Sequence, residues 1–257
     1  MRQNILITND DGVNSNGLQA LTEEASLFGR VTVVAPEHGM SGMSHAITMS
    51  NPIYLRRIRH GGNLSVYACH GTPVDCVKIA IDHVMEREPP TIVLSGINHG
   101  SNSNISVIYS GTLGAATEGF SYGIASIGFS LTDHDPDADL TATRYYVRRV
   151  LQTVLERDSK EPVCLNVNVP SLPMEQIKGI RVCRQTKGYW QEEFVRNTDP
   201  RGRDYYWLTG KFHNIEPKET ESDEWALANG YVSIVPVMVD LTDYKRLDMC
   251  KEWFSLK

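Results

Sequence analysis

Short apolar runs that alternate with amphipathic helix patterns constrain the fold of this chain more than any other feature. The runs predict buried strands at residues 4–8, 31–35, 92–94, 124–129 and 163–169. The helix patterns lie between them, at about residues 16–28, 73–88, 112–120 and 139–156. Such alternation is typical of a mainly parallel sheet that is covered by helices on both faces. We therefore expect an α/β fold that binds ligands at the carboxyl ends of its strands.

Start and stop signals support the helix boundaries. In the first helix, apolar side chains recur at spacings of three and four until Gly29 ends the pattern. Thr72 suits the N-cap of the second helix, and Pro73 suits its first helical position. Asp75 follows Thr72 at the spacing of a capping box, so this helix start has a complete local signal.

The pattern changes beyond Pro170. Strands are expected at residues 180–185, 205–208 and 231–237, without long helices between them, and a short helix is expected at 244–254. A further strand pair is expected at 52–58 and 64–69, around a turn at residues 60–63. We interpret the chain as one α/β domain over residues 1–257. Its core would cover about 1–170, and a C-terminal β-hairpin and helix extension would cover about 171–257.

Composition narrows the function classes. The 257 residues carry a formal net charge of −6 and no long basic run, which argues against binding of a nucleic-acid polymer. A small phosphorylated substrate stays open, because a metal ion can supply the local positive charge. No segment approaches the roughly 20 apolar residues of a membrane span, and the apolar start is too short for a secretory signal. The five cysteines form no C-x-x-C pair, so we expect reduced thiols and a cytoplasmic protein.

Two adjacent aspartates, Asp10 and Asp11, follow the first predicted strand directly. Neighbouring side chains of a strand point to opposite faces, so the two carboxylates can converge only if the chain turns there, and Gly12 permits that turn. Side by side, they repel each other unless a cation or a proton lies between them. Their hard oxygen atoms favour Mg²⁺, Mn²⁺ or Ca²⁺ over zinc. A solvated turn or a helix cap is the alternative, and the pair alone does not decide between the two.

Two further loops at strand ends add small, polar side chains. A helix N-terminus with free N–H groups and hydroxylated residues suits a phosphate group. Because the carboxyl ends of parallel strands share one edge of the sheet, we expect these loops to meet the aspartate pair. The loop histidines, His38, His45 and His99, are weaker candidates for proton transfer. The polar residues are Ser41, Gly42, Ser44, Asn98, Asn102, Ser110, Gly111 and Thr112.

These motifs together resemble the SurE family of stationary-phase survival proteins, which act as 5′(3′)-nucleotidases. The similarity runs through ILITNDDG, APEHGMSG, GTPVDCV, SGINHGSN, YSGTLGAATEG, GYVSIVPV and DLTDY, and so covers most of the chain. It implies a Rossmann-like three-layer α/β sandwich with one divalent metal ion per subunit, Mg²⁺ or Mn²⁺. It also implies hydrolysis of nucleoside 5′-monophosphates, with 3′-monophosphates and short polyphosphate as further substrates. Members form homodimers, or tetramers as dimers of dimers, by exchanging C-terminal elements.

The resemblance also assigns roles to particular residues. The implied metal ligands are Asp10, Asp11, Ser41 and Asn98. The implied phosphate-binding residues are Asn102, Ser110, Gly111 and Thr112. The two aspartates would be catalytic, either by activating a water molecule or by direct attack that gives an aspartyl-phosphate. Residues 103–106 depart from the family, which often has a glycine and an acidic residue there, so the loop that sets substrate preference differs.

Three other classes of protein compete with this interpretation. A phosphorylation-controlled receiver domain also has an acidic pair after its first strand. It needs an acceptor aspartate and a lysine at later strand ends, where this chain has Ser95, Gly96, Asn98, Ser130 and Leu131. A haloacid-dehalogenase-like phosphatase needs its aspartates two residues apart. A nucleotide-binding module without catalysis would bind the nucleotide but release no phosphate.

Overall fold

A nine-stranded sheet forms the centre of the computed structural model, which describes residues 3–157 and 161–255. The strand order is β3-β4-β2-β1-β5-β6-β7-β13-β8. The strands are β1 (Gln3–Thr8), β2 (Gly29–Pro36), β3 (Leu55–Gly61), β4 (Leu64–Cys69), β5 (Ile92–His99), β6 (Ala125–Leu131), β7 (Cys164–Val169), β8 (Ile180–Val182) and β13 (Val232–Val237).

The six strands from β4 to β7 in this order run parallel, and β3 and β13 pair antiparallel at the two sides of this group. From β1 the chain builds outward to β2 and β4, and then returns to place β5, β6 and β7 on the other side of β1. The order therefore reverses between β1 and β5. In open α/β sheets, ligands bind beside the carboxyl ends of the strands at this switch point.

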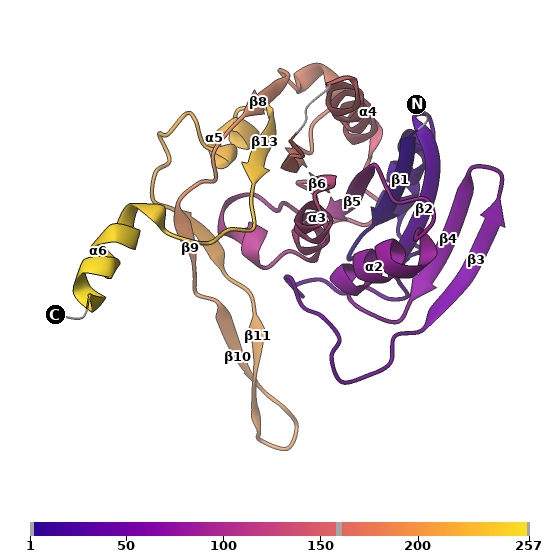
Figure 1. The fold of residues 1–257 in the computed structure, drawn as a ribbon. Coiled ribbons are helices and arrows are strands. Elements are labelled where there is room, and N and C mark those ends of the chain that lie inside the picture. The colour runs from indigo at the N-terminus through magenta and orange to yellow at the C-terminus, as the bar shows by residue number, and fades with distance from the viewer. Residues whose placement is uncertain (1–2, 158–160, 256–257) are drawn as a thin grey trace.

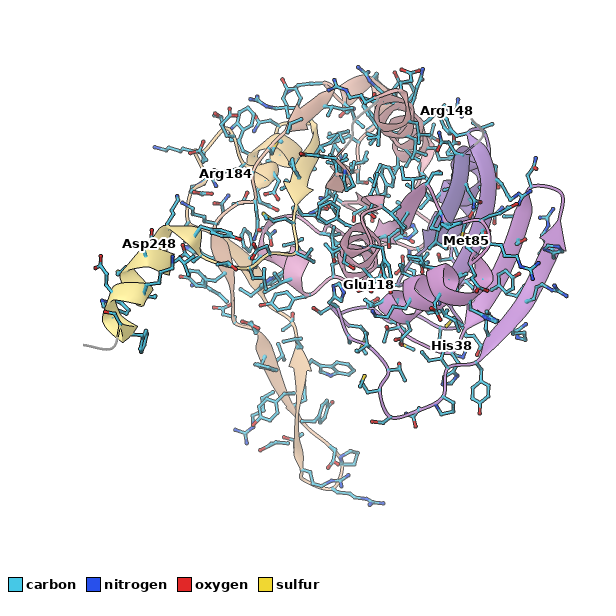
Figure 2. The ribbon with its side chains drawn as sticks, in the orientation of Figure 1. His38, Met85, Glu118, Arg148, Arg184 and Asp248 are labelled. Atoms are coloured by element: carbon cyan, nitrogen blue, oxygen red, sulfur yellow. The ribbon has the colours of Figure 1, made fainter. Side chains whose placement is uncertain are left out.

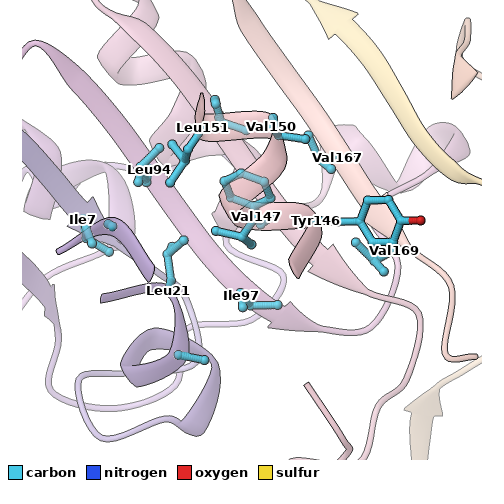
Figure 3. Packing of buried hydrophobic residues seen from close by; sticks show 14 of the residues in the cluster. Ile7, Leu21, Leu94, Ile97, Tyr146, Val147, Val150, Leu151, Val167 and Val169 are labelled. Atoms are coloured by element: carbon cyan, nitrogen blue, oxygen red, sulfur yellow. The ribbon is translucent and has the colours of Figure 1, made fainter. Parts of the chain in front are cut away.

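Helices cover both faces of the sheet, so the fold has three layers (Figure 1). On one face, α1 (Asn16–Ala25) packs on β1 and α4 (Thr141–Glu156) packs on α1 and β7, and their buried side chains form one core with Ile5 and Ile7. Figure 3 shows Val147 of α4 among the buried side chains of this layer. On the other face, α2 (Pro73–Ile79) and α3 (Gly111–Ser121) form a second core around Leu6. Successive residues of β1 thus point to opposite layers, which is why its apolar run is uninterrupted.

Capping residues in the sequence fix the start of α2. Thr72 caps α2 in a capping box with Asp75, and Pro73 is the first helical residue, as the sequence predicts. The helix continues as the π-helical turn η1 (Ala80–Val84) and ends before the two prolines. The strand expected at 52–58 forms instead at Leu55–Gly61. This edge strand is mostly exposed, so burial does little to fix its boundaries.

Beyond the core, the chain forms small antiparallel strand pairs, as expected for the extension. They comprise β9 (Gly188–Gln191) with β12 (Lys211–Asn214), and β10 (Phe194–Thr198) with β11 (Asp204–Leu208). The β10–β11 hairpin projects away from the body, and α6 (Tyr244–Phe254) also stands apart (Figure 1). The strands β9, β10 and β12 and the helix α5 (Asp223–Ala228) were not predicted. The strand expected at 180–185 ends at Val182, because Arg184 pairs with Ser222 instead.

The fold is therefore α/β, with a mostly parallel central sheet and a C-terminal hairpin and helix. In the part of the chain that the structure describes, no helix combines the length and the apolar character that crossing a membrane requires.

Candidate active site

The aspartate pair lies at the switch point of the sheet, where β1 ends. Gly12 adopts a φ of +98°, which turns the chain directly after the two carboxylates, as the sequence predicts. The buried side chain of Asn9 fastens this turn by donating to the Gly12 carbonyl (3.0 Å) and to Ser15 Oγ (2.8 Å). The loop after β2 closes over the pair, since the Met40 N–H donates to the Asp10 carbonyl at 2.6 Å.

Asp10 follows β1 and lies against the first residues of α3. It is buried, with only 3% of its surface exposed. The hydroxyl of Thr112 donates to its Oδ1 atom. Gly111 lets the helix come this close, because a Cβ atom at that position would lie 2.8 Å from the Asp10 Cβ. Burial, and next the charge of Asp11, raise the pKa of Asp10 from 3.8 to about 6. No lysine, arginine or histidine within residues 3–157 and 161–255 forms an ion pair with it.

Asp11 is more accessible and has a histidine neighbour. Its Oδ2 atom accepts a hydrogen bond from the His99 backbone N–H at 3.4 Å and lies 3.7 Å from His99 Nδ1. The His99 side chain is 7% exposed, and its Nε2 atom has no hydrogen-bond partner among the residues that the structure describes. Of the loop histidines singled out in the sequence, His99 is thus the one in contact with the aspartate pair.

Asn98 reaches the same place through an irregularity in β5. The register between β5 and β6 shifts between Ser95 and Asn98, and such a bulge re-aims the side chains that follow it. The Nδ2 atom of Asn98 donates to the Gly100 carbonyl at 2.6 Å, which leaves its carboxamide oxygen for another partner. Ser41 is exposed on the loop after β2.

Two cavities meet at the aspartates. A cavity of about 460 Å³ is lined by Asp10 and also by Ser41, Asn98, Asn102 and Ser110. A neighbouring cavity of about 680 Å³ is lined by Asp11, Ser41, His38, His99 and His134. No lysine or arginine of the described part of the chain lines either cavity. Three of the four predicted metal ligands, Asp10, Ser41 and Asn98, thus line one cavity, and the fourth, Asp11, lines the neighbouring cavity together with Ser41.

The predicted phosphate-binding residues divide into two groups. Asn102 and Ser110 line the 460 Å³ cavity. Asn102 is held by its Nδ2 atom on Ser130 Oγ (2.9 Å), and Ser110 caps α3 by accepting from the Leu113 N–H (3.1 Å). Gly111 and Thr112 instead contact Asp10, and neither lines the cavity. Their contact with a phosphate group stays a prediction.

Contacts of Ser44 and His45 hold the loop after β2, and two of their partners and neighbours, Glu118 and Lys78, were not singled out in the sequence. The loop after β2 is fastened by Ser44, whose N–H donates to the Tyr109 carbonyl at 3.0 Å. His45 contacts Glu118 of α3 at 2.7 Å, and Lys78 contacts the same carboxylate at 2.6 Å. In Figure 2, Glu118 lies where α3 faces α2. No local pattern announces such pairs, because their members are more than 30 residues apart.

The loop after β5 is fastened from the C-terminal part of the chain. Asn104, the first residue of the 3₁₀ helix η2 (Asn104–Ile108), has a φ of +51°. Its N–H donates to the buried Asp223 (2.9 Å), and its side chain donates to Glu224 Oε1 (2.8 Å). Ser103 Oγ also donates to Glu224, at 2.5 Å. The stretch that departs from the family is thus held in place by α5.

Comparisons with known proteins agree with this architecture. The family described as "Survival protein SurE" matches residues 5–192. A protein of Phocaeicola vulgatus named "5′-nucleotidase SurE" is 46% identical over 249 residues, covering 97% of this chain and 96% of the relative. One of Flavobacterium johnsoniae with the same name is 47% identical over 250 residues, with the same coverage. The crystal structure of the Sure protein from Aquifex aeolicus superposes with a TM-score of 0.84 at 37% identity, covering 98% of this chain and 100% of that one. A switch-point aspartate pair, a matching profile over most of the chain and near full-length relatives lead to one conclusion: this chain belongs to the SurE family.

Proposed function

We propose that this chain is a divalent-metal-dependent phosphomonoesterase that hydrolyses nucleoside 5′-monophosphates to nucleoside and phosphate. One observation carries the proposal. Two adjacent carboxylates border two neighbouring cavities that contain hydrogen-bonding side chains but no lysine or arginine from the described residues. A phosphate dianion would be repelled there unless a cation joined it. The relatives named 5′-nucleotidase supply the substrate class.

The side chains present fit a hard divalent cation. Asp10 is buried and has no cationic partner in the part of the chain that the structure describes. Asp11, Ser41 and Asn98 add further oxygen atoms in the same two cavities. Oxygen ligands of this kind suit Mg²⁺ or Mn²⁺. When bound, the ion would neutralise charge on the transferred phosphoryl group.

Side chains of this protein would bind the phosphate group and take up the proton of the attacking water. Asn102 and Ser110, the N-cap residue of α3, orient the phosphate oxygens, since both border the same cavity. Asp10 is engaged by Thr112 and is buried, so it serves as a fixed ligand. Asp11 is 21% exposed at the edge of the more open cavity, where water can reach it. We propose that Asp11 accepts the proton of the attacking water. Nucleoside 3′-monophosphates and short polyphosphate are proposed as further substrates of the same site.

Exposed apolar side chains on the C-terminal extension are the reason to propose an oligomer. Within one domain over residues 1–257, we propose that the extension from about residue 171 is exchanged between protomers of a homodimer, or of a tetramer built from dimers. Large apolar side chains are exposed on the β10–β11 hairpin: Phe194 by 66%, Trp207 by 65% and Leu208 by 70%. Such a surface is rare on a soluble monomer and marks an interaction site. A monomeric mass in light scattering at micromolar concentration would contradict this part of the proposal.

The test of the activity is phosphate release from nucleoside 5′- and 3′-monophosphates in EDTA, Mg²⁺ or Mn²⁺. The expected result is metal-dependent release by the wild type, and its loss in Asp10→Ala and Asp11→Asn. Full activity in EDTA, or in Asp11→Asn, would refute the proposed roles. Tight nucleotide binding without release in any metal would favour the non-catalytic binding module.

A further inference from the structure

The 460 Å³ cavity has two chemically different ends. One end is polar and carries the aspartate, asparagine and serine side chains of the core. The other end is lined by Tyr109, Trp190 and Leu208, with Glu193 and Thr209 beside them. Trp190, Glu193, Leu208 and Thr209 come from the C-terminal extension, so this wall is supplied by a different part of the chain from the carboxylates. The volume is in the range of cavities that enclose small organic ligands.

Trp190 is held as a fixed surface. It lies in β9 opposite Phe212 of β12, and the two rings make an edge contact with centroids 6.3 Å apart. The strand β9 also packs against η2, the helix directly before Tyr109. The Trp190 side chain is half-buried by these contacts, although it still lines the cavity. An aromatic ring that is already immobilised loses little conformational freedom when a flat ligand stacks on it.

Tyr109 connects the aromatic wall with the proposed phosphate-binding residues of the same cavity. It directly precedes Ser110, the N-cap of α3, and its carbonyl accepts the hydrogen bond from the Ser44 N–H. Half of its surface, 51%, is exposed. An aromatic ring and the proposed phosphate site are thus carried by adjacent residues of one restrained segment, within the span of a single small molecule.

The charge of the aromatic end excludes a second phosphate group. Among the described residues that line this end, Glu193 carries a carboxylate. No described lysine or arginine lines it to balance that negative charge. A carboxylate next to aromatic and aliphatic side chains suits a neutral, flat group with N–H or O–H donors. A nucleobase attached to its ribose has this chemistry, and any base presents a face for stacking.

We propose that Trp190 and Tyr109 form the surface on which the nucleobase of the substrate stacks, with Leu208 completing it and Glu193 accepting from the base or the ribose. This inference rests on the proposed nucleotidase function. Stacking does not read the edges of the bases, so the site tolerates different bases. It discriminates instead between nucleotides and phosphomonoesters that lack a base.

The test compares kcat/KM for adenosine 5′-monophosphate and for ribose 5-phosphate, which lacks the base. The wild type prefers the nucleotide. In Trp190→Ala, the ratio of the two values falls by about tenfold, the loss expected for one base–aromatic stack. Trp190→Phe retains most of the preference. Tyr189→Ala is the matched control: Tyr189 is the neighbouring residue of β9, does not line the cavity, and its ring packs on His213 instead.

The outcomes separate this inference from the function on which it rests. If the wild type hydrolyses both substrates and Trp190→Ala keeps the ratio of the wild type, the base-stacking surface is refuted while the nucleotidase stands. An equal loss on both substrates in Trp190→Ala would also refute it, since the residue would then support the site as a whole. If the wild type hydrolyses neither substrate with Mg²⁺ or Mn²⁺, the proposed function itself fails.

Discussion

Replacing Asp10 with asparagine should stabilise the metal-free protein while it abolishes turnover. The wild-type carboxylate is buried, and its pKa is raised from 3.8 to about 6, first by burial and then by the charge of Asp11. At about 1.4 kcal/mol per pKa unit, keeping this group ionised at pH 7 costs the folded state roughly 3 kcal/mol. Asparagine keeps an acceptor for the Thr112 hydroxyl but adds a buried N–H₂ group, which lowers the expected gain to about 1–2 kcal/mol.

The pH dependence follows from the same pKa. Between pH 4 and pH 6, the folded wild type holds a proton on Asp10 that the unfolded chain has released, so its stability falls as the pH rises through this window. The stability of the Asp10→Asn protein should not decrease in this way, because asparagine does not titrate. Below about pH 3, the carboxyl group is protonated in both the folded and the unfolded wild type. Asp10→Asn should then be the less stable protein by about 1–2 kcal/mol, because only the cost of its buried N–H₂ group remains. The stability of Asp10→Asn relative to the wild type should therefore rise from about pH 4 to pH 6, change sign within this window and stay constant above it.

Thermal unfolding in EDTA, followed by circular dichroism at several pH values, measures this effect. A gain of 1–2 kcal/mol corresponds to a rise in Tm of roughly 2–8 °C for a chain of this size. Addition of Mg²⁺ should reverse the order, because a ligand at 100 times its Kd stabilises the wild type by about 2.7 kcal/mol. A metal-free Asp10→Asn protein that is less stable than the wild type at pH 7, or is stabilised equally by Mg²⁺, would refute the reasoning.

Three further predictions concern the surroundings of the site. Gly111→Ala should lower phosphate release at least tenfold with little change in far-UV circular dichroism, because its Cβ would lie 2.8 Å from the Asp10 Cβ; wild-type turnover would contradict the close approach. Glu118→Ala should speed hydrogen exchange in residues 37–50, which lose an anchor, whereas unchanged exchange would show that the anchor is dispensable. In the native protein, Cys250 should react with a thiol reagent far faster than Cys164, whose pKa burial raises to about 12; equal rates, measured by mass spectrometry after digestion, would argue against that burial.

The sequence predicts those features whose causes are local. The strand before Asp10, the turn at Gly12 and the capping box of Thr72 depend on residues that are neighbours in the chain, and the structure has all three. The alternation of strands and helices was sufficient to predict the α/β class and to place the carboxyl ends of the strands at one edge.

The features that the sequence did not predict depend on contacts between distant segments. Asn104 is held by Asp223 and Glu224, which follow it by about 120 residues. Trp190 reaches the cavity only because β9 pairs with β12 across the intervening hairpin. The sequence assigns Thr112 to phosphate binding, which stays a prediction, and it did not predict that the Thr112 hydroxyl donates to Asp10, 102 residues earlier. Local sequence patterns do not indicate which segments so far apart in the chain come into contact.

The central place of β1 in the sheet has a consequence for how the site comes into being during synthesis. The two aspartates leave the ribosome before the rest of the sheet, and β1 gains its neighbour β5 only when residue 92 and those after it have emerged. The Thr112 hydroxyl that holds Asp10 comes later still, and the aromatic wall follows near residue 190. A nascent chain therefore carries its two reactive carboxylates for most of translation before any metal can be held tightly. Arrested chains that end before residue 112 should bind no Mg²⁺ detectably, whereas the complete chain should bind it as soon as it folds.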